Sequence, residues 1–333
     1  MNVKQSDIAA KLGISRVTVT KALQDSPDIS KGMKKKVKKI AEEMDYIPNL
    51  TARHLTSRKT RTIGIVLPDI TNFYFSAIVR GMMEVAENES YHIILTVSRE
   101  DKSKESENIF KLLSMNVEGL LVCQTLDTVD VKIFEKVKKR KIPLVFFGRP
   151  VGFSGFDSIG FDDYKASQKL TELLISKGKT KIAHISGDIK SDGGLRLQGF
   201  LDTMKKHKID VRKDWIYLGK YFPEYGFEGF NKIYKLNDLP EVIFCGNGMI
   251  ARGVYEAIRA KKLNIPDDIS VVAIDHQRYS EMLYPKLTHI DYPTRTLGLE
   301  AMNLLIKKIE SQNSKKIDNI TLDTFFIENE SLV

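Results

Sequence analysis

The sequence predicts an all-α helix-turn-helix head followed by an α/β core of two doubly wound parallel-sheet lobes. Two short amphipathic segments joined by a glycine turn stand near the start of the chain. After residue 61, short apolar runs alternate with amphipathic stretches of helical length. With 333 residues and 42% hydrophobic side chains, the chain suits two or three soluble domains.

The first two helices are predicted from a local pattern of caps and apolar positions. Residues 7–12 (DIAAKL) carry one apolar face, and Gly13 after them suits a left-handed C-terminal cap. Ser15 can accept a hydrogen bond from the Thr18 N–H, so a second helix begins at Arg16. Two short helices joined in this way form the unit whose second helix enters the DNA major groove.

The second helix carries the side chains that are expected to read bases. Arg16 and Lys21 point outward with Val17 beside them; Arg and Lys bond guanine edges, and Val contacts a thymine methyl group. A third helix, capped by Ser30, is predicted over residues 31–44 and packs its apolar stripe against the first two. The alternative is a three-helix packing module without a DNA role.

The charge of the head argues against a mere packing module. Residues 1–60 contain 13 Lys and Arg against 6 Asp and Glu, a net charge of +7, and the remainder carries +2. A basic head on a nearly neutral body is typical of a nucleic-acid-binding segment. The lysine run within residues 34–39, taken alone, also fits a solvated helix face.

No early segment has the pattern of a secretory signal, and no apolar run approaches the length of a membrane span. We therefore expect a cytoplasmic protein with no membrane partner. Cys123 and Cys245 end apolar strand-like runs and are interpreted as buried thiols. The histidines show no ligand spacing and no catalytic constellation stands out, so we expect no metal, no cofactor and no enzymatic activity.

The segment after the third helix is predicted to connect the head to the core. Ile47 precedes Pro48 and is pushed away from helical geometry, which ends the helix. Asn49 can cap a short segment over residues 50–56 that is marginal alone. The predicted domains are residues 1–48 for the helix-turn-helix, 49–60 for the hinge segment and linker, and 61–333 for the core.

These segments resemble the head of the LacI/GalR family of bacterial transcription regulators. The residues that carry the resemblance are Asp7-Ile-Ala, Gly13-Ile-Ser, Thr18-Val-Thr-Lys-Ala-Leu23, Ile29-Ser30 and Asp45-Tyr-Ile-Pro-Asn49. The resemblance implies that a hinge helix over residues 50–56 orders on DNA and inserts Leu55 into the minor groove. The alternative for Leu55 is packing on the body.

The resemblance implies a set of DNA contacts: Ser15, Arg16, Val17, Thr18, Lys21, Tyr46, Asn49, Ala52, Arg53 and Leu55. One departure lies at the start of the first helix, where Lys4 stands in place of the family's capping Thr or Ser. Ser6 is the alternative cap, so the phosphate contacts of the first turn are open.

Apolar strand-like runs organise the rest of the chain; they lie at residues 63–67, 92–97, 119–123, 144–147, 182–186, 242–245 and 271–275. Amphipathic stretches between them include residues 77–86, 108–115 and 166–176. This alternation predicts parallel sheets covered on both faces, with ligands beyond the carboxyl ends of the strands.

The core resembles the periplasmic-binding-protein-like core of the same family, in which the chain crosses between lobes near Gly160, Ile290 and Thr324. The resemblance therefore places lobe 1 at about residues 61–159 plus 291–323, and lobe 2 at about 160–290 plus 324–333. It also implies that the core binds an effector and forms the dimer.

Seven residues are candidates for effector binding: Tyr74, Phe75, Asp162, Arg196, Tyr221, Asn247 and Asp275. Tyr74 and Phe75 follow the first strand, and their rings can stack on a sugar or base unless their helix buries them. Arg196 offers fixed donors to hydroxyls or a carboxylate, although a salt bridge at a helix start is the alternative. Asp275 ends a buried strand and suits ligand hydroxyls; a structural carboxylate is its alternative.

The segment Gly246–Ala251 (GNGMIA) fits the G-x-G-x-x-A dinucleotide fingerprint, so an NAD-binding enzyme is a remote alternative. The match lies mid-chain and lacks an acidic residue at the expected spacing. In the family's register Asn247 contacts sugar, whereas Gly248 stands where Asp is usual and His276 where Asp or Asn is common.

The residues and the resemblance together predict a sequence-specific regulator that binds a near-palindromic operator in double-stranded DNA as a homodimer. We expect it to repress carbohydrate-utilisation genes under the control of a small, sugar-like effector between the two lobes. The alternatives are control by a partner protein or by a non-sugar metabolite.

Overall fold

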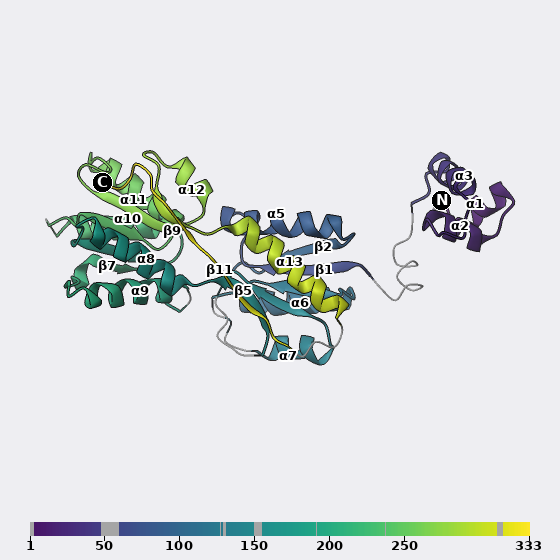
Figure 1. Ribbon diagram of the computed structural model, residues 1–333, viewed down its shortest axis with the longest axis horizontal. Coiled ribbons are helices and arrows are strands. Elements are labelled where there is room, and N and C mark those ends of the chain that lie inside the picture. The colour runs from purple at the N-terminus through teal and green to yellow at the C-terminus, as the bar shows by residue number, and fades with distance from the viewer. Residues whose placement is uncertain are drawn as a thin grey trace. The chain divides into compact units, whose positions relative to one another are not determined.

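The computed structural model describes residues 3–47, 60–126, 128, 131–149, 155–190, 192–236, 238–311 and 316–333. The chain divides into two compact units, Met1–Thr60 and Arg61–Val333, whose helices and strands are drawn in Figure 1. In the described part of the chain, no helix combines the length and apolarity needed to cross a membrane.

The head contains α1 (Gln5–Leu12), α2 (Arg16–Leu23) and α3 (Lys31–Glu43). Gly13 ends α1 in the left-handed conformation with φ 64°, as its position after the apolar segment predicts. Ser15 accepts a hydrogen bond from the Thr18 N–H at 3.1 Å, which confirms the predicted cap of α2. The three helices pack around a small buried core: Ile8, Ala9, Val19, Ala22, Val37 and Ala41.

The start of α1 differs from the prediction. The helix begins at Gln5 instead of Asp7, and Ser6 lies inside it and not at its cap. The carboxylate of Asp7 accepts the backbone N–H of Lys4 at 2.8 Å. A carboxylate in the first helical turn therefore stabilises this end without a capping Ser or Thr.

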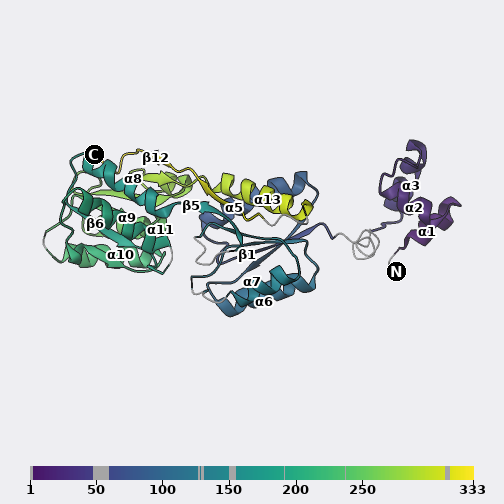
Figure 2. The ribbon, with the colours of Figure 1, turned by 60° about the horizontal axis from the view of Figure 1, so that its bottom comes forward.

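Lobe 1 is built on a parallel six-stranded sheet of order β11-β5-β4-β3-β1-β2. Its strands are β1 (Thr62–Leu67), β2 (His92–Val97), β3 (Gly119–Val122), β4 (Leu144–Phe147), β5 (Asp157–Phe161) and β11 (Asn319–Leu322). Helices α5 (Phe73–Asn88) and α13 (Thr294–Glu310) cover one face, and α6 (Lys102–Ser114) and α7 (Lys132–Lys139) cover the other (Figure 2).

Alternation along β1 explains why both faces of this sheet are apolar. Ile63, Ile65 and Leu67 pack against the layer of α5 and α13, whereas Val66 packs against that of α6 and α7. Successive side chains of a strand point to opposite faces, so a strand buried on both sides reads as one continuous apolar run.

Lobe 2 has a second six-stranded sheet, of order β12-β10-β9-β8-β6-β7. Its strands are β6 (Ile182–Ser186), β7 (Ile216–Leu218), β8 (Val242–Cys245), β9 (Ser270–Asp275), β10 (Thr288–Asp291) and β12 (Phe325–Ile327). Helices α8 (Asp163–Ser176) and α9 (Asp192–Lys206) pack on one face, and α10 (Pro223–Tyr234) and α11 (Gly248–Ala260) on the other. The edge strand β12 pairs antiparallel with β10, a departure from the all-parallel pattern.

The chain passes between the two sheets at three places. It leaves lobe 1 after β5, returns after β10 into α13, and passes again between β11 and β12. The two sheets together contain five strands that do not appear among the apolar runs of the sequence: β5, β7, β10, β11 and β12. The short α12 (Gln277–Met282) follows β9 and contributes to the wall between the lobes.

Candidate functional site

The outer surface of α2 carries the side chains that are predicted to read DNA. Val17 is 65% exposed, although it lies in a helix whose other apolar residues are mostly buried. Arg16 is exposed beside it, and the Lys21 ammonium forms an exposed ion pair with Asp28 at 2.7 Å. An exposed ion pair contributes little to stability, so Lys21 is available to a base edge or phosphate.

Other predicted DNA contacts lie around this surface. The hydroxyls of Ser15 and Thr18 lie 2.9 Å apart at the start of α2. Tyr46 is half-buried and packs against the core of the head, so its ring supports the domain as well. Four further predicted contacts lie outside the described residues: Asn49, Ala52, Arg53 and Leu55.

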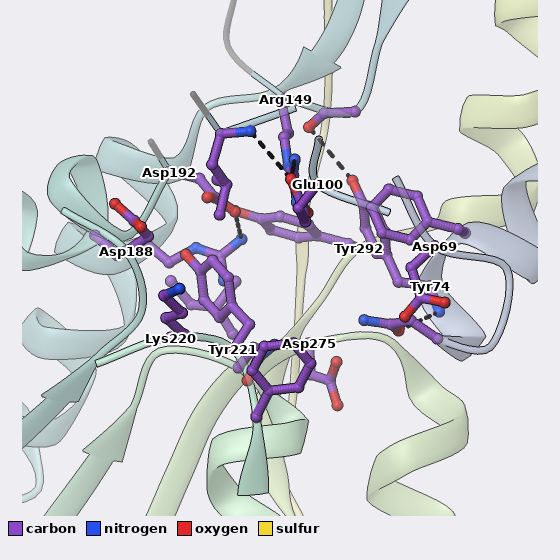
Figure 3. Close-up of a pocket in the computed structure, with 18 of the residues that line it drawn as sticks. Asp69, Tyr74, Glu100, Arg149, Asp188, Asp192, Lys220, Tyr221, Asp275 and Tyr292 are labelled. Atoms are coloured by element: carbon purple, nitrogen blue, oxygen red, sulfur yellow. Dashed lines mark hydrogen bonds and ion pairs between the residues drawn. The ribbon is translucent and has the colours of Figure 1, made fainter. Parts of the chain in front are cut away.

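A cavity of about 360 Å³ lies between the two sheets of the core, and Figure 3 shows the side chains that point into it. Every lining residue follows, or stands at, the carboxyl end of a strand, as expected for doubly wound sheets. The lining residues are Asp69, Asn72, Tyr74, Phe75, Arg99, Glu100, Leu126, Gly148, Arg149, Asp188, Asp192, Arg196, Lys220, Tyr221, Phe222, Asn247, Ile274, Asp275, Tyr279 and Tyr292.

Arg196 is the central charged group on the lobe 2 side. It lies in the first turns of α9, and its guanidinium is held by Asp163 at 2.7 Å and by Asp192 at 3.2 Å. The guanidinium also lies over the rings of Tyr221 and Tyr292, at 5.7 and 5.4 Å from their centroids. Arg196 therefore forms the salt bridge of the alternative interpretation and also lines the cavity, and its effector role stays a prediction.

Asp163 supports Arg196 from behind the cavity. It is buried at the start of α8, and it accepts a hydrogen bond from the Tyr292 hydroxyl at 2.7 Å. Burial and the neighbouring Asp192 raise the pKa of Asp163 to about 6, and Arg196 opposes this rise. Since Tyr292 follows β10 and Asp163 follows β5, this hydrogen bond joins two of the crossings between the lobes.

A second, partly buried ion pair stands on the lobe 1 side. The guanidinium of Arg149 donates two hydrogen bonds to the carboxylate of Glu100, at 2.6 and 3.0 Å, and a third to the Gln124 carbonyl at 2.9 Å. Glu100 and its neighbour Arg99 have left-handed backbones, with φ 56° and 55°. Such backbones are costly for residues other than glycine, so the paired carboxylate helps to hold this loop.

Asp275 ends β9 at the floor of the cavity. It is 8% exposed, and its Oδ2 has no hydrogen-bond partner among the described residues. Burial raises the pKa of Asp275 to about 7. A β-carbon at position 248 would overlap this Oδ2, so the carboxylate occupies the space that Gly248 leaves free at the start of α11. The departure from the family's usual Asp at position 248 thus has a direct structural consequence.

One rim of the cavity is closed by rings from both lobes. Phe73 at the start of α5 lies 5.2 Å from the ring of Tyr279 in α12, and the Arg278 guanidinium lies 4.0 Å over the Phe73 ring. His276 stacks edge-on to Tyr279 at 5.3 Å, and burial lowers its pKa to about 4. We call this group of Phe73, His276, Arg278 and Tyr279 the inter-lobe clasp.

The structure brings six of the seven predicted effector residues to the cavity: Tyr74, Phe75, Arg196, Tyr221, Asn247 and Asp275. Phe75 is also 5% exposed and packed in the core, as its alternative interpretation expects, and its role in stacking on an effector stays a prediction. Asp162 is not among the lining residues. Its carboxylate accepts the Lys165 N–H at 3.0 Å and caps α8, and the next residue, Asp163, faces Arg196 instead.

Most of the lining residues are absent from the sequence prediction, and three of them form the ion pair and hydrogen bond described above: Glu100, Arg149 and Tyr292. These three residues follow the carboxyl ends of β2, β4 and β10. In doubly wound sheets, ligands bind beyond the carboxyl ends of the strands, so this rule predicts residues at these positions. Two of those strands are visible in the sequence as apolar runs. Applied to each of them, the rule would have included Glu100 and Arg149.

A basic helix-turn-helix head and a ligand-sized cavity between two doubly wound lobes together define a DNA-binding regulator with an effector-binding core. Residues 5–49 match the family described as bacterial regulatory proteins, lacI family. Residues 60–330 match periplasmic binding proteins and the sugar binding domain of the LacI family. The chain therefore belongs to the LacI family of bacterial regulatory proteins.

Individual relatives agree with this assignment. The chain is similar to the HTH-type transcriptional regulator RegA of Clostridium saccharobutylicum, with 32% identity over 331 residues and 98% of both chains covered. Catabolite control protein A of Priestia megaterium is 29% identical over 314 residues, or 94% of both chains. The lac repressor dimer bound to operator and the anti-inducer ONPF has the same fold, with a TM-score of 0.89, 22% identity and full coverage of both chains.

Proposed function

We propose that this regulator is a cytoplasmic homodimer that represses carbohydrate-utilisation genes and responds to a sugar-like effector in the cavity. Two heads on one dimer match two half-sites of a near-palindromic operator. Arg16, Val17 and Lys21 then read bases in each major groove, because they occupy the exposed face of α2.

The observation that supports a sugar-like effector is the mixture of groups around one cavity. Tyr74 and Tyr221 supply aromatic faces against which the apolar side of a sugar ring stacks. Asp275 and Asn247 supply side chains that suit hydroxyl groups, and Oδ2 of Asp275 is a buried acceptor with no partner in the described residues. A buried acceptor of this kind gains free energy when a ligand hydroxyl bonds it.

The cavity is placed so that a ligand can alter the angle between the lobes. Its walls come from both sheets, and the inter-lobe clasp closes one rim through contacts of Phe73 with Arg278 and Tyr279. A ligand that prefers one lobe angle shifts the population towards that angle. In a dimer, this shift changes the separation of the two heads and therefore the operator affinity.

The fingerprint-like segment at the start of α11 is better explained by this function than by NAD binding. A dinucleotide places its pyrophosphate at the helix N-terminus. Here the Asn247 side chain accepts the Ile250 N–H at 2.9 Å, and the Asp275 carboxylate fills the space beside Gly248. A pyrophosphate at this position would meet the carboxylate directly.

The proposal is tested first by ligand-induced stabilisation of the full-length protein. Its thermal midpoint is measured against a panel of sugars, sugar phosphates, nucleobases and NAD, because a ligand that binds only the folded state raises the midpoint. A sugar hit that also changes operator affinity supports the proposal. A hit by NAD or a nucleobase alone contradicts a sugar effector, and a silent panel favours control by a partner protein.

A matched pair of variants then tests the location of the site. Asp275→Ala removes the buried acceptor and should abolish the response to the effector while operator binding stays measurable. Asp162→Ala removes a helix cap outside the cavity, at a cost of about 1 kcal/mol of stability, and should keep the response. Operator release is followed by fluorescence anisotropy. A response that survives in Asp275→Ala, or disappears in Asp162→Ala, would show that the effector binds elsewhere.

A further inference from the structure

The balance of charge around the cavity restricts the chemistry of its effector. Among the described residues that line it, five carry carboxylates, whereas four carry cationic side chains. A sixth carboxylate, that of Asp163, lies directly behind Arg196. An anionic ligand would therefore meet at least as many acidic as basic side chains around the cavity.

The guanidinium of Arg196 has no free edge for a second carboxylate or phosphate. An arginine recognises such an anion most strongly through two parallel N–H groups. In Arg196, Nε donates to Oδ1 of Asp163 at 2.8 Å, and Nη2 forms an ion pair with the same oxygen at 2.7 Å. Nη1 donates to the Gly246 carbonyl, and Asp192 lies 3.2 Å from Nη2.

Arg149, on the opposite lobe, is occupied in the same way. Its Nη1 and Nη2 donate in parallel to the two carboxylate oxygens of Glu100. The second N–H of Nη1 donates to the Gln124 carbonyl. Glu100 is fixed in turn, because it also accepts the Leu126 N–H at 3.1 Å. An anionic ligand would have to displace this carboxylate from a paired arginine before it could bind Arg149 in the same way.

The N-terminus of α11, one of the helix starts at the cavity, is also occupied. Helix N-termini attract anions through their free N–H groups. The Asp275 carboxylate lies against Gly248 at this end, and Asp275 is one of the residues that line the cavity. Arg99 and Lys220, the two cations at the mouth, are exposed, so they remain hydrated and screened by salt.

We propose that the effector presents hydroxyl or amino donors to this cavity and carries no carboxylate or phosphate group. This inference rests on the proposed function, since it assigns the chemical class of the ligand that the cavity binds. A neutral sugar and its amino sugar share the required chemistry, and the corresponding uronate and sugar phosphate do not.

The first test measures the charge preference of the cavity without knowledge of the effector. Leu126→Cys and Phe222→Cys place a thiol on each side of the cavity in the full-length protein. Each variant is reacted with a cationic trimethylammonium-ethyl and an anionic sulfonatoethyl methanethiosulfonate. The wild type serves as the background, because Cys123 and Cys245 are buried.

The expected result is a cation-to-anion rate ratio several-fold higher than the ratio that the same reagents give with 2-mercaptoethanol. The two positions stand on different lobes, and Lys220 next to Phe222 favours the anionic reagent, which makes that position the stricter test. A ratio at or below that of the free thiol at both positions would overturn the proposal.

The second test uses matched sugars on the wild-type protein. D-glucose, D-glucosamine, D-glucuronate and D-glucose 6-phosphate, and the corresponding galactose series, are compared by the shift they cause in the thermal midpoint. A neutral or amino sugar should shift the midpoint more than its anionic counterpart, and the glucosamine arm separates the two permitted classes. A uronate or phosphate that binds more tightly than its neutral parent would overturn the proposal. The thiol rates decide the charge class even if no sugar is the effector.

Discussion

Lys21 on the recognition helix is engaged by Asp28 in the absence of DNA. The side-chain hydrogen bond and charge of Lys21 lower the pKa of Asp28, but both groups are largely exposed. The pair is therefore weak and exchangeable, and it orients the ammonium without blocking it. A lysine that reads a base or phosphate must give up such a partner on binding.

The Lys21→Ala variant should weaken operator binding by about 1–3 kcal/mol and relax base preference at one position of each half-site. Asp28→Ala is the matched control, because it breaks the same ion pair and leaves the lysine in place. It should leave operator affinity unchanged or slightly higher. Fluorescence anisotropy with single-base operator variants measures both. Unchanged, fully selective binding by Lys21→Ala would contradict the assigned orientation of α2.

The raised pKa of Asp275 predicts a specific pH dependence of stability. Its folded pKa is about 7 against an ordinary value of 3.8, so the folded state keeps a proton that the unfolded state loses. Stability that is present below about pH 4 is therefore lost as the pH rises to 7, by at most about 1.4 kcal/mol per pH unit. His276, whose pKa is lowered, acts oppositely, since its contribution is lost as the pH falls from 6.5 towards 4.

Asp275→Asn should remove the Asp275 contribution and leave that of His276. The difference in unfolding free energy between the variant and the wild type should therefore grow in favour of the variant from pH 4 to pH 7 and then level off. Thermal or urea unfolding of the full-length protein across this range gives the difference. A constant difference over the whole range would mean that Asp275 titrates normally in the folded protein.

Residues whose partners are close in sequence were predictable, and residues with distant partners were not. The caps Ser15 and Ser30 each bond an N–H three residues away, so the local pattern identified them. The Arg149–Glu100 pair joins residues 49 positions apart, and no local sequence pattern predicts such a pair. The sequence does not show whether Asp162 or Asp163 faces the cavity, because the direction of a side chain at a helix start depends on where the helix begins.

At the level of elements, α5 and α13 approach each other closely at two glycines. A β-carbon at Gly298 would overlap the carbonyl oxygen of Ile78, and one at Gly81 would overlap that of Arg295. Backbone atoms, unlike the end of a flexible side chain, cannot move aside without shifting the helix. The absence of a side chain at both positions therefore sets the distance between these helices.

Gly298→Ala should destabilise the core by about 1–3 kcal/mol, because overpacking at a backbone contact forces the helices apart. Gly32→Ala in α3 is the control, since a β-carbon there meets no atom within 4 Å. That change should instead stabilise its helix by about 0.5–1 kcal/mol through higher helix propensity. Thermal melting of the full-length variants distinguishes the two. A core melting unchanged by Gly298→Ala would show that the helices adjust freely.

The strands that the sequence predicted and those that it missed differ in whether they contain a continuous apolar run; β10 (THID), for example, is buried but mostly polar. Strands β1, β2, β3, β4, β6, β8 and β9 contain apolar runs and were predicted, with boundaries correct to about one residue. The edge strands β7, β11 and β12 are short and partly exposed, so they lack a continuous apolar run. Strand β5 contains Gly160 and two polar residues, so it also lacks a continuous apolar run in the sequence.

On the scale of the whole core, the two lobes are held together by more than the chain crossings. Tyr292 after β10 bonds Asp163 after β5, and the inter-lobe clasp joins α5 to α12. These contacts come from segments that surround the cavity. We therefore expect a ligand that fills the cavity to alter the contacts that join the lobes, as coupling between the cavity and the head requires.

The strands β11 and β12, described above as edge strands of different sheets, are separated by only Asp323 and Thr324. One short segment late in the chain therefore finishes both lobes. During synthesis on the ribosome, residues 62–161 emerge early. The sheet that they form gains its last strand, β11, and its covering helix, α13, only near the end of the chain. Until then the face of α5 that contains Gly81 has no helix against it. We therefore expect the nascent chain to expose this apolar surface until α13 is made, which favours aggregation or chaperone binding before the lobe is complete.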